Sequence, residues 1–221
     1  MDTAGLTAVT ARIAEAAGRV GRSPDAVKLV VVSKGRSVAE ITAVYEAGHR
    51  VFGENRADEL AAKVPLLPAD IEWHFVGSLQ RRKVATVWPL IALLHSLDRE
   101  KLIDAWAREQ GTPPALLQVN IAAEPQKHGA APNDAARLLD MARSSGVRVV
   151  GLMVIPPLPG APEDSRRWFA DLEALRAALQ PDFPGLVHTS MGMTDDFEVA
   201  VEEGATLVRV GRAIFGPSVA G

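Results

Sequence analysis

The chain has 221 residues, 48% of them hydrophobic, which is enough for one large core or two small ones. Its net charge of -3 excludes the overall basic field that favours a nucleic-acid partner. The absence of cysteine excludes disulfides, thiolate metal sites and a cysteine nucleophile.

The amino end of the chain shows no targeting segment. Residues 1–5 lack the basic region and the uninterrupted apolar stretch of a signal peptide. No window approaches the apolar length of a membrane-spanning helix, since the longest apolar stretch, residues 87–94, is short and contains Pro89. We therefore expect a cytoplasmic protein that contacts no membrane. No surface stripe is obviously apolar, so we also expect a monomer.

Periodicity predicts one leading helix and then eight strands. Residues 6–20 are rich in alanine and carry apolar residues at helical spacing, which predicts a helix over about residues 5–20. The short apolar segments that follow are typical of strands buried on both faces of a parallel sheet. The predicted strands are Val27–Ser33, His49–Gly53, Trp73–Gly77, Leu93–Leu97, Ala115–Ile121, Val147–Ile155, Leu186–Met191 and Thr206–Val210.

Helical segments lie between these strands, and the alternation predicts a parallel sheet. Eight such units in roughly 200 residues fit a small (β/α)8 TIM barrel, with an open doubly wound sheet as the alternative. We expect one domain over residues 1–221, with the barrel over about residues 27–217 and the extra N-terminal helix capping one end. The predicted helices are Val38–Gly48, Asn55–Lys63, Leu79–Val87, Arg99–Gln110, Asn133–Ser145, Asp164–Leu179 and Phe197–Glu203.

Lys34 stands directly after the first predicted strand and before Gly35. The carboxyl ends of parallel strands are where such proteins place their chemistry. A lysine there can lose its proton more readily than a solvated one, and the neutral amine can form a Schiff base with a carbonyl. The alternative is a lysine that only extends from a strand end into water.

The segments after the seventh and eighth strands are typical of an anion site. Ser190 and Gly192 end one strand, and Gly211 allows a ligand to approach the backbone before a short helical turn at residues 213–216. In this fold the loops after strands seven and eight often bind phosphate. Arg212 can add a charge-assisted contact to such a group. The alternative is that the glycines only form tight turns.

An amine that forms Schiff bases and a phosphate site in the same mouth together predict pyridoxal 5′-phosphate (PLP) as the ligand. The aldehyde would join Lys34, and the phosphate would lie opposite. An arginine near the pyridine nitrogen would keep that nitrogen unprotonated and weaken the ring as an electron sink. Arg209 is the candidate for this role, with a structural ion pair as its alternative.

Six motifs occur in the order that characterises a known family. The chain resembles the pyridoxal phosphate homeostasis protein family, also called the YggS or PROSC family, from about residue 6 to its end. The resemblance implies a barrel like the N-terminal domain of bacterial alanine racemase, a Schiff base at Lys34, and positions near the ring for Asn55 and Met193. The motifs are Val32-Ser33-Lys34, Phe52-Gly53-Glu54-Asn55, Trp73-His74-Phe75-Val76-Gly77-Ser78-Leu79-Gln80, Gly151-Leu152-Met153, Ser190-Met191-Gly192-Met193-Thr194-Asp195-Asp196 and Arg209-Val210-Gly211-Arg212-Ala213-Ile214-Phe215-Gly216.

The same resemblance implies how the cofactor is held and what it is for. Ser190, Gly192 and Gly211 would hold the phosphate, and Arg209 would face the pyridine nitrogen. The family binds and carries PLP in vitamin B6 homeostasis and has no established catalytic turnover. The implied partners are PLP itself and PLP-dependent apo-enzymes that receive it.

Two enzyme alternatives stay open. One is a PLP-dependent racemase-like or decarboxylase-type enzyme, and the other is a phosphate-sugar barrel enzyme in which Lys34 forms a Schiff base with its substrate. A racemase needs a second proton-transfer group. The only tyrosine, Tyr45, lies on a helix away from the predicted mouth, and the chain ends soon after the eighth unit. We therefore expect no catalytic residue in the strict sense.

Three positions depart from the family pattern. Arg56 stands where a tyrosine is usual, Gly35 where a threonine is usual, and Arg212 where threonine or serine is usual. Arg212 removes a small hydroxyl donor from the final motif. Our hypothesis is that its guanidinium replaces that hydroxyl at the phosphate, and the alternative is that the side chain points to solvent.

Other polar residues have simpler interpretations. His74 and His95 lie in strands without metal-ligand spacing, so we expect core or mouth histidines and no metal site. Asp195 and Asp196 precede the predicted helix at residues 197–203, and acidic groups favour helix amino termini. We expect this pair to cap that helix.

Overall fold

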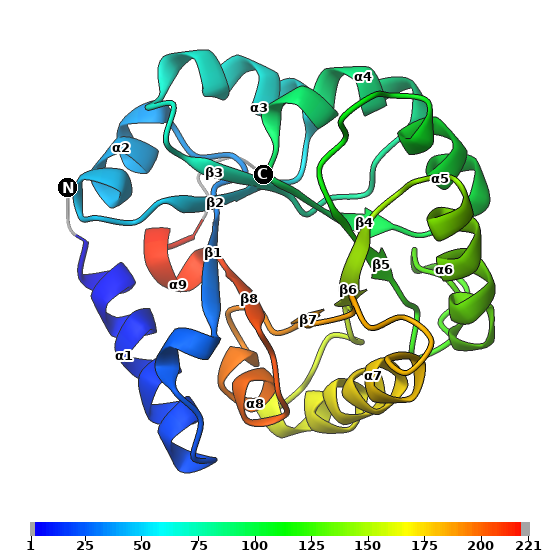
Figure 1. Ribbon diagram of the computed structural model, residues 1–221. Coiled ribbons are helices and arrows are strands. Elements are labelled where there is room, and N and C mark those ends of the chain that lie inside the picture. Colours follow the sequence, from blue (N-terminus) through cyan, green and yellow to red (C-terminus); the bar gives the residue numbers. More distant parts are fainter. Residues whose placement is uncertain (1–2, 218–221) are drawn as a thin grey trace.

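The computed structural model describes residues 3–217 as a closed barrel of eight parallel strands, each paired with its sequence neighbour and the first with the last (Figure 1). This confirms the predicted (β/α)8 fold and the strand order. The single-domain assignment over residues 1–221 stays a prediction, and its ends, residues 1–2 and 218–221, lie outside the described residues. The strands are β1 (Lys28–Val32), β2 (Val51–Glu54), β3 (Glu72–Phe75), β4 (Leu93–Leu97), β5 (Ala115–Gln118), β6 (Val149–Met153), β7 (His188–Ser190) and β8 (Leu207–Val210).

Helices follow the strands and form the outer ring of Figure 1. Several begin or end as short 3-10 turns, so the predicted helix over residues 79–87 is a 3-10 turn followed by a single α-helical turn. The α-helices are α1 (Ala4–Arg19), α2 (Val38–Glu46), α3 (Ala57–Lys63), α4 (Val84–Val87), α5 (Glu100–Ala107), α6 (Ala135–Ser144), α7 (Arg166–Leu179), α8 (Phe197–Glu202) and α9 (Arg212–Phe215). The 3-10 helices are η1 (Pro24–Ala26), η2 (Val64–Leu66), η3 (Arg81–Lys83), η4 (Trp88–Leu90), η5 (Pro132–Asp134) and η6 (Pro162–Ser165).

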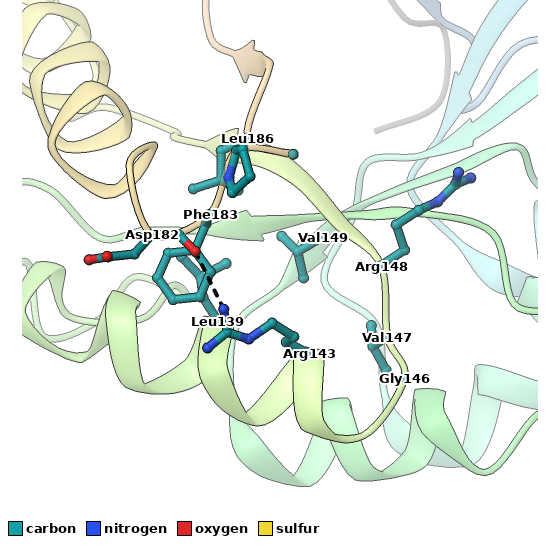
Figure 2. Close-up of a pocket in the computed structure, with 11 residues that line it drawn as sticks. Leu139, Arg143, Gly146, Val147, Arg148, Val149, Asp182, Phe183 and Leu186 are labelled. Atoms are coloured by element: carbon teal, nitrogen blue, oxygen red, sulfur yellow. Dashed lines mark hydrogen bonds between the residues drawn. The ribbon is translucent and has the colours of Figure 1, made fainter.

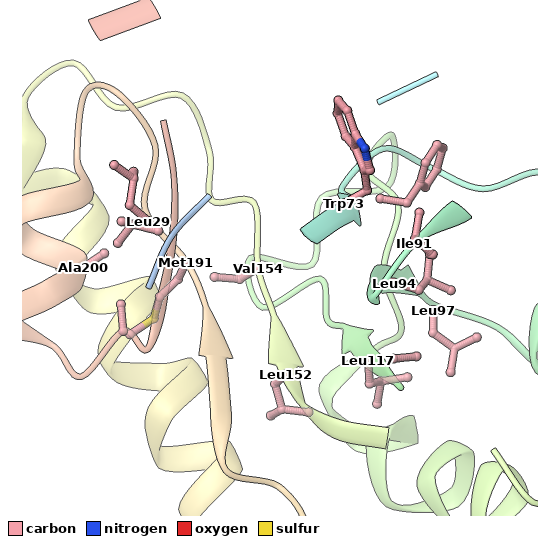
Figure 3. Close-up of a cluster of buried hydrophobic side chains, with 14 of the residues drawn as sticks. Leu29, Trp73, Ile91, Leu94, Leu97, Leu117, Leu152, Val154, Met191 and Ala200 are labelled. Atoms are coloured by element: carbon pink, nitrogen blue, oxygen red, sulfur yellow. The ribbon is translucent and has the colours of Figure 1, made fainter. Parts of the chain in front are cut away.

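Alternation along the strands divides the apolar side chains into two layers. A small cluster that includes Val30, Leu116 and Leu207 fills the inside of the barrel. A much larger cluster lies between the sheet and the helices, and Figure 3 shows part of it around Leu94 and Leu152. The strands are therefore buried on both faces, which explains their almost continuous apolar sequences.

The amino-terminal helix does not cap an end of the barrel, so that expectation is wrong. Helix α1 lies on the outer wall beside α8 and α9, and Arg12 pairs with Glu198 across the α1–α8 contact at 2.9 Å. A Cβ on Gly5 would lie 2.4 Å from the carbonyl oxygen of Ile214, so the glycine allows α1 to approach α9 closely. Helix α9 has only four residues. The apolar face of α1 therefore covers outer wall that α9 is too short to cover.

Arg22 anchors the segment after α1 to the carboxyl end of α8. Its guanidinium donates to the carbonyl oxygens of Val201 at 2.6 Å and Ala205 at 2.9 Å.

We predict that Arg22→Ala lowers the free energy of unfolding by about 1–3 kcal/mol, because two carbonyls lose a charged donor. Urea unfolding followed by tryptophan fluorescence measures the change. Arg19→Ala is the control, because Arg19 forms an exposed pair with Glu202 that should contribute at most about 1 kcal/mol; equal effects of the two substitutions would contradict the assignment.

Candidate functional site

A cavity of about 410 Å³ opens at the carboxyl ends of the strands. Its volume falls in the range of roughly 300–1,000 Å³ that is usual for small-molecule sites, and its position is the one where barrels of this fold carry their chemistry. Six of the eight predicted site residues line it. They are Lys34, Asn55, Met193, Arg209, Gly211 and Arg212.

A second cavity, of about 320 Å³, lies at the opposite end of the barrel, between the end of α6 and the segments that enter β6 and β7 (Figure 2). Its main cationic group is already engaged: Arg143 stacks on the Phe183 ring at 5.0 Å and donates to the carbonyl oxygen of Asp182 at 3.4 Å. The amino ends of barrel strands serve stability more than chemistry. We therefore take the cavity at the carboxyl ends as the candidate site.

Lys34 lies in the turn that follows β1, with Gly35 beside it at a φ of +66°. Its side chain is exposed and lines the cavity. Within residues 3–217 no hydrogen bond or ion pair engages its amine. The amine is therefore accessible to a ligand that enters from solvent.

A buried ion pair holds the backbone on the amino side of Lys34. Lys63, from α3, donates to the carbonyl oxygen of Ser33 at 2.9 Å and to the Glu54 carboxylate at 2.5 Å. The Ser33 hydroxyl donates to the same carboxylate at 2.8 Å. Glu54 is fully buried, and burial raises the pKa of its carboxyl. Sequence analysis missed Lys63, because its contact with Ser33 depends on how α3 packs.

The carboxyl side of Lys34 is held by the same helix. Glu59 accepts from the backbone N–H of Gly35 at 2.9 Å and from the Lys63 amine at 3.1 Å. The pKa of Glu59 is lowered: burial opposes the shift, but the hydrogen bonds from Gly35 and Lys63 outweigh it. Helix α3 thus fixes the backbone on both sides of Lys34 and leaves the side chain free.

Arg209 carries a buried positive charge to the wall of the cavity. It is 4% exposed and donates to the Ser190 hydroxyl at 2.6 Å and to the carbonyl oxygen of Val154 at 2.9 Å. Burial lowers the pKa of Arg209 to about 10, so the group stays protonated at neutral pH. Its partners are a hydroxyl and a carbonyl, so the structural ion pair that was the alternative is not what holds it.

Asn55 lines the cavity and has an unsatisfied polar atom in its side chain. Its side-chain oxygen is buried and has no hydrogen-bond partner within the described part of the chain. Gly77 packs against the Asn55 backbone so closely that a Cβ on Gly77 would lie 2.1 Å from the backbone carbonyl oxygen of Asn55. An unpaired buried acceptor is costly. The site therefore fits a ligand that brings a donor to this atom.

Ser190 and Gly192 lie behind the cavity wall. The Ser190 side chain is fully buried and contacts both Arg209 and His95. Gly192 has a φ of +86°, and a Cβ there would lie 2.5 Å from the Cβ of Ala200 in α8. The glycine is thus required by its backbone conformation and by helix packing.

The rim of the cavity is formed by the loops after β7 and β8. A Cβ on Gly211 would lie 2.9 Å from the carbonyl oxygen of Val32, so only glycine fits between β8 and β1 at this point. Arg212 is exposed and pairs with Asp195 across the rim. Its guanidinium is therefore held by a carboxylate at the mouth.

The two aspartates do not cap α8 with their side chains, so that expectation is wrong. Asp196 occupies the N-cap position, but its carboxylate accepts from the backbone N–H of Met193 and from the Ser165 hydroxyl, both at 2.7 Å. Asp195 pairs with Arg212 instead. Asp196 therefore stabilises the loop that carries Met193 to the cavity, and its side chain does not cap the amino end of α8.

Sequence analysis missed several residues that line the cavity. Thr194 directly follows Met193, and its hydroxyl beside a glycine-containing turn was an available signal. Arg36 is 7% exposed and bonds to the carbonyl oxygen of Phe215 at 3.2 Å, joining the loop after β1 to the end of α9. The remaining lining residues are Val32, Val76, Ile155, Leu158 and Asp195.

Comparison with known proteins gives a consistent result. The model of the family described as "Alanine racemase, N-terminal domain" matches residues 5–219. A relative from Aquifex aeolicus, named pyridoxal phosphate homeostasis protein, is 40% identical over 218 residues that cover 96% of each chain. The structure of an unknown protein from Bifidobacterium adolescentis has a TM-score of 0.91 at 33% identity, covering 96% of this chain and 94% of that one. PipY from Synechococcus elongatus, solved with PLP bound, has a TM-score of 0.78 at 38% identity, covering 92% and 100%.

The chain therefore belongs to the alanine racemase N-terminal domain family, and within it to the pyridoxal phosphate homeostasis proteins. This confirms the family that the motifs indicate. Between residues 3 and 217, no helix combines the length and hydrophobicity that crossing a bilayer requires. In the same range no cluster of histidine and carboxylate side chains has the arrangement of a metal site.

We predict that Lys63→Met destabilises the fold by about 3–5 kcal/mol at pH 8, because it leaves the buried Glu54 carboxylate without its cation. The pKa of Glu54 is already raised by burial and will rise further without Lys63. A carboxyl with a raised pKa stabilises the folded state below that pKa and loses this contribution as the pH increases. The deficit should therefore shrink between pH 8 and pH 5 in urea titrations.

Lys83→Met is the matched control for this prediction. Lys83 pairs with Asp58 at 2.6 Å, but the Asp58 side chain is 81% exposed. Removing that pair should cost at most about 1 kcal/mol at either pH. A deficit for Lys63→Met as small as this would show that the Glu54 site is open to water.

Proposed function

We propose that this protein binds PLP reversibly at the carboxyl-end cavity and serves as an intracellular PLP carrier in vitamin B6 homeostasis. The observation that carries the proposal is the joint presence, in one cavity, of the accessible Lys34 amine and the buried Arg209 cation. The names of the relatives and the PLP bound by PipY support the same ligand.

The residues present fit this ligand. PLP supplies an aldehyde, a pyridine ring and a phosphate. Lys34 would hold it by a Schiff base, in which the amine nitrogen bonds to the aldehyde carbon with loss of one water molecule. Arg209 would donate to the pyridine nitrogen and, because it keeps its own proton, leave that nitrogen unprotonated. The unpaired side-chain oxygen of Asn55 and the Met193 side chain would lie along the ring.

The phosphate would lie at the rim formed by Gly211 and Arg212. Gly211 gives a ligand access to the backbone, and Arg212 places a cation there. Gly192 and Ser190 would support this end from behind the wall, through the loop after β7 that brings Met193 and Thr194 to the cavity. Arg212 already pairs with Asp195, so its guanidinium would have to share its charge between that carboxylate and the phosphate.

We also propose that the protein works without catalytic turnover, as a cytoplasmic monomer that delivers PLP to apo-enzymes. The homeostasis names of its relatives support a carrier. The single tyrosine, Tyr45, donates to Asp70 at 2.7 Å and is absent from the cavity lining, so it is not placed as a second proton-transfer group. The exposed position of Lys34 gives an incoming acceptor access to the bond that has to be broken.

We predict that the purified protein, mixed with PLP, develops an absorbance band near the violet edge of the visible spectrum. Borohydride should fix the cofactor on the peptide that contains Lys34, as peptide mass spectrometry will show. Lys34→Ala should lose both signals, and Lys101→Ala, which removes an exposed lysine on α5, should keep them. A wild-type protein that PLP cannot colour would refute the proposed function.

We expect no interconversion of L- and D-alanine by the PLP-loaded protein above the level of the Lys34→Ala variant. Chiral chromatography after prolonged incubation measures this with high sensitivity. Racemisation by the wild type that is lost in Lys34→Ala would replace the carrier by the racemase-like alternative.

A further inference from the structure

A chain of buried polar groups crosses the interior of the barrel. Nδ1 of His74, on β3, lies 3.0 Å from Nε2 of His95, on β4. Nδ1 of His95 lies 2.9 Å from the hydroxyl of Ser190, on β7. The three side chains are at most 1% exposed. They connect three different strands through an interior that is otherwise largely apolar.

Each end of this chain is a charged group. At the amino ends of the strands, Nε2 of His74 contacts the Glu72 carboxylate at 2.9 Å, and Glu72 pairs with Lys28 at the same distance. The Lys28 and Glu72 side chains are 48% and 38% exposed, so this end meets water. At the other end, Arg209 donates to Ser190 and lines the candidate cavity.

The available protons define the direction of every bond. Glu72 pairs with the Lys28 amine at 2.9 Å, so its carboxylate is ionised and can only accept a hydrogen bond. His74 must therefore donate from Nε2. Burial lowers the pKa of both His74 and His95, so both rings are neutral and each carries one proton. Nδ1 of His74 then accepts from Nε2 of His95, and Nδ1 of His95 accepts from the Ser190 hydroxyl.

We infer that His74 and His95 form a positioning relay that turns the Ser190 hydroxyl toward β4 and thereby presents its oxygen to Arg209. The relay fixes Arg209 in the cavity and connects it to water at the opposite end of the barrel. It rests on the proposed function only in assigning Arg209 to the bound cofactor.

The two hydrogen bonds that His95 makes in the relay reverse their direction together when His74 takes up a proton. A proton added to His74 would make its Nδ1 a donor, and His95 would then donate to Ser190. The Ser190 hydrogen would lose its acceptor while its oxygen received two donors. One protonation at the Glu72 end would therefore disturb the contact that holds Arg209.

The other ionisable groups around the relay do not change this direction. His188, on β7, contacts the Thr206 hydroxyl at 3.2 Å, and its pKa is lowered, mainly by burial. Lys28 and Arg209 are cationic and oppose an added proton. Asp196 acts on Arg209 but belongs to the loop outside the barrel. Glu72 is the carboxylate in contact with a relay histidine, so an added proton is best held at His74.

Nitrogen NMR of the protein without added PLP tests the bond directions directly. At pH 7.5 both His74 and His95 should show the neutral tautomer with the proton on Nε2. His128, whose side chain is 66% exposed, should show mixed tautomers and serves as the internal reference. A proton on Nδ1 of His95 at this pH would overturn the relay, whether or not the protein binds PLP.

Two substitutions at His95 test the connection to Arg209. His95→Asn keeps a polar atom near Nδ1, where it can accept from Ser190, and His95→Gln places its amide near Nε2 and loses that contact. We expect His95→Gln to weaken PLP binding about tenfold, the effect of one hydrogen bond of about 1.4 kcal/mol, and to shift the absorbance band. His95→Asn should stay within about threefold of the wild type on the same argument. Each variant is first compared with the wild type in thermal unfolding.

The outcomes separate the relay from the proposed function. Failure of the wild type to bind PLP would refute the proposed function and leave the tautomer result standing. Equal PLP affinity and spectra for the wild type and His95→Gln would overturn the relay. If His95→Gln does not fold, His74→Asn replaces it: this variant removes the ring that can take up the added proton and keeps a polar atom near the Nδ1 position. Nitrogen NMR should then show that His95 keeps its proton on Nε2 as the pH is lowered, whereas in the wild type protonation of His74 moves it to Nδ1. The same pH-dependent shift in both proteins would also overturn the relay.

Discussion

The burial of one guanidinium is the constraint on which the interior of this barrel depends. Arg209 enters the core from β8 and donates to a hydroxyl and a carbonyl, and no carboxylate among residues 3–217 is in hydrogen-bond contact with it. A buried charge is tolerated only where polar groups are oriented toward it. The histidines of β3 and β4 supply this orientation through Ser190. The need to orient polar groups toward Arg209 thus explains why polar residues lie inside a barrel whose interior cluster is otherwise apolar.

A second buried network serves the other functional end of the cavity in a different way. Lys63, Glu54 and Glu59 form ion pairs that bind the backbone around Lys34 and leave its amine free. The two networks have different effects. The histidine network holds the side chain of Arg209, whereas the Lys63 network holds the backbone around Lys34 and leaves the Lys34 side chain free to move. A covalent carrier needs both properties, because the ring must be placed reproducibly and the amine must reach and release its partner.

Local sequence patterns predict most of this architecture, because each strand is a short apolar run and each helix has its own periodicity. They also place Lys34 and Arg209 at strand positions that meet at one end of the barrel. What they miss depends on packing between distant segments. The contact of Lys63 with Ser33 and the direction of the Ser190 hydroxyl are decided by strand register and helix placement. The position of α1 was missed for the same reason: the short helical turn after β8 was predicted, but the packing of α1 against α8 and α9 joins segments far apart in the sequence.

The charge of the cavity differs from the charge of the whole chain. The protein carries a net charge of -3, yet the described residues that line the cavity include four cationic side chains, Lys34, Arg36, Arg209 and Arg212, and one carboxylate, Asp195. Low-dielectric walls concentrate such a local field, and this raises the concentration of anions at the mouth. In the function proposed above, this local field would direct a phosphate ester to the end of the barrel where the Lys34 amine is exposed.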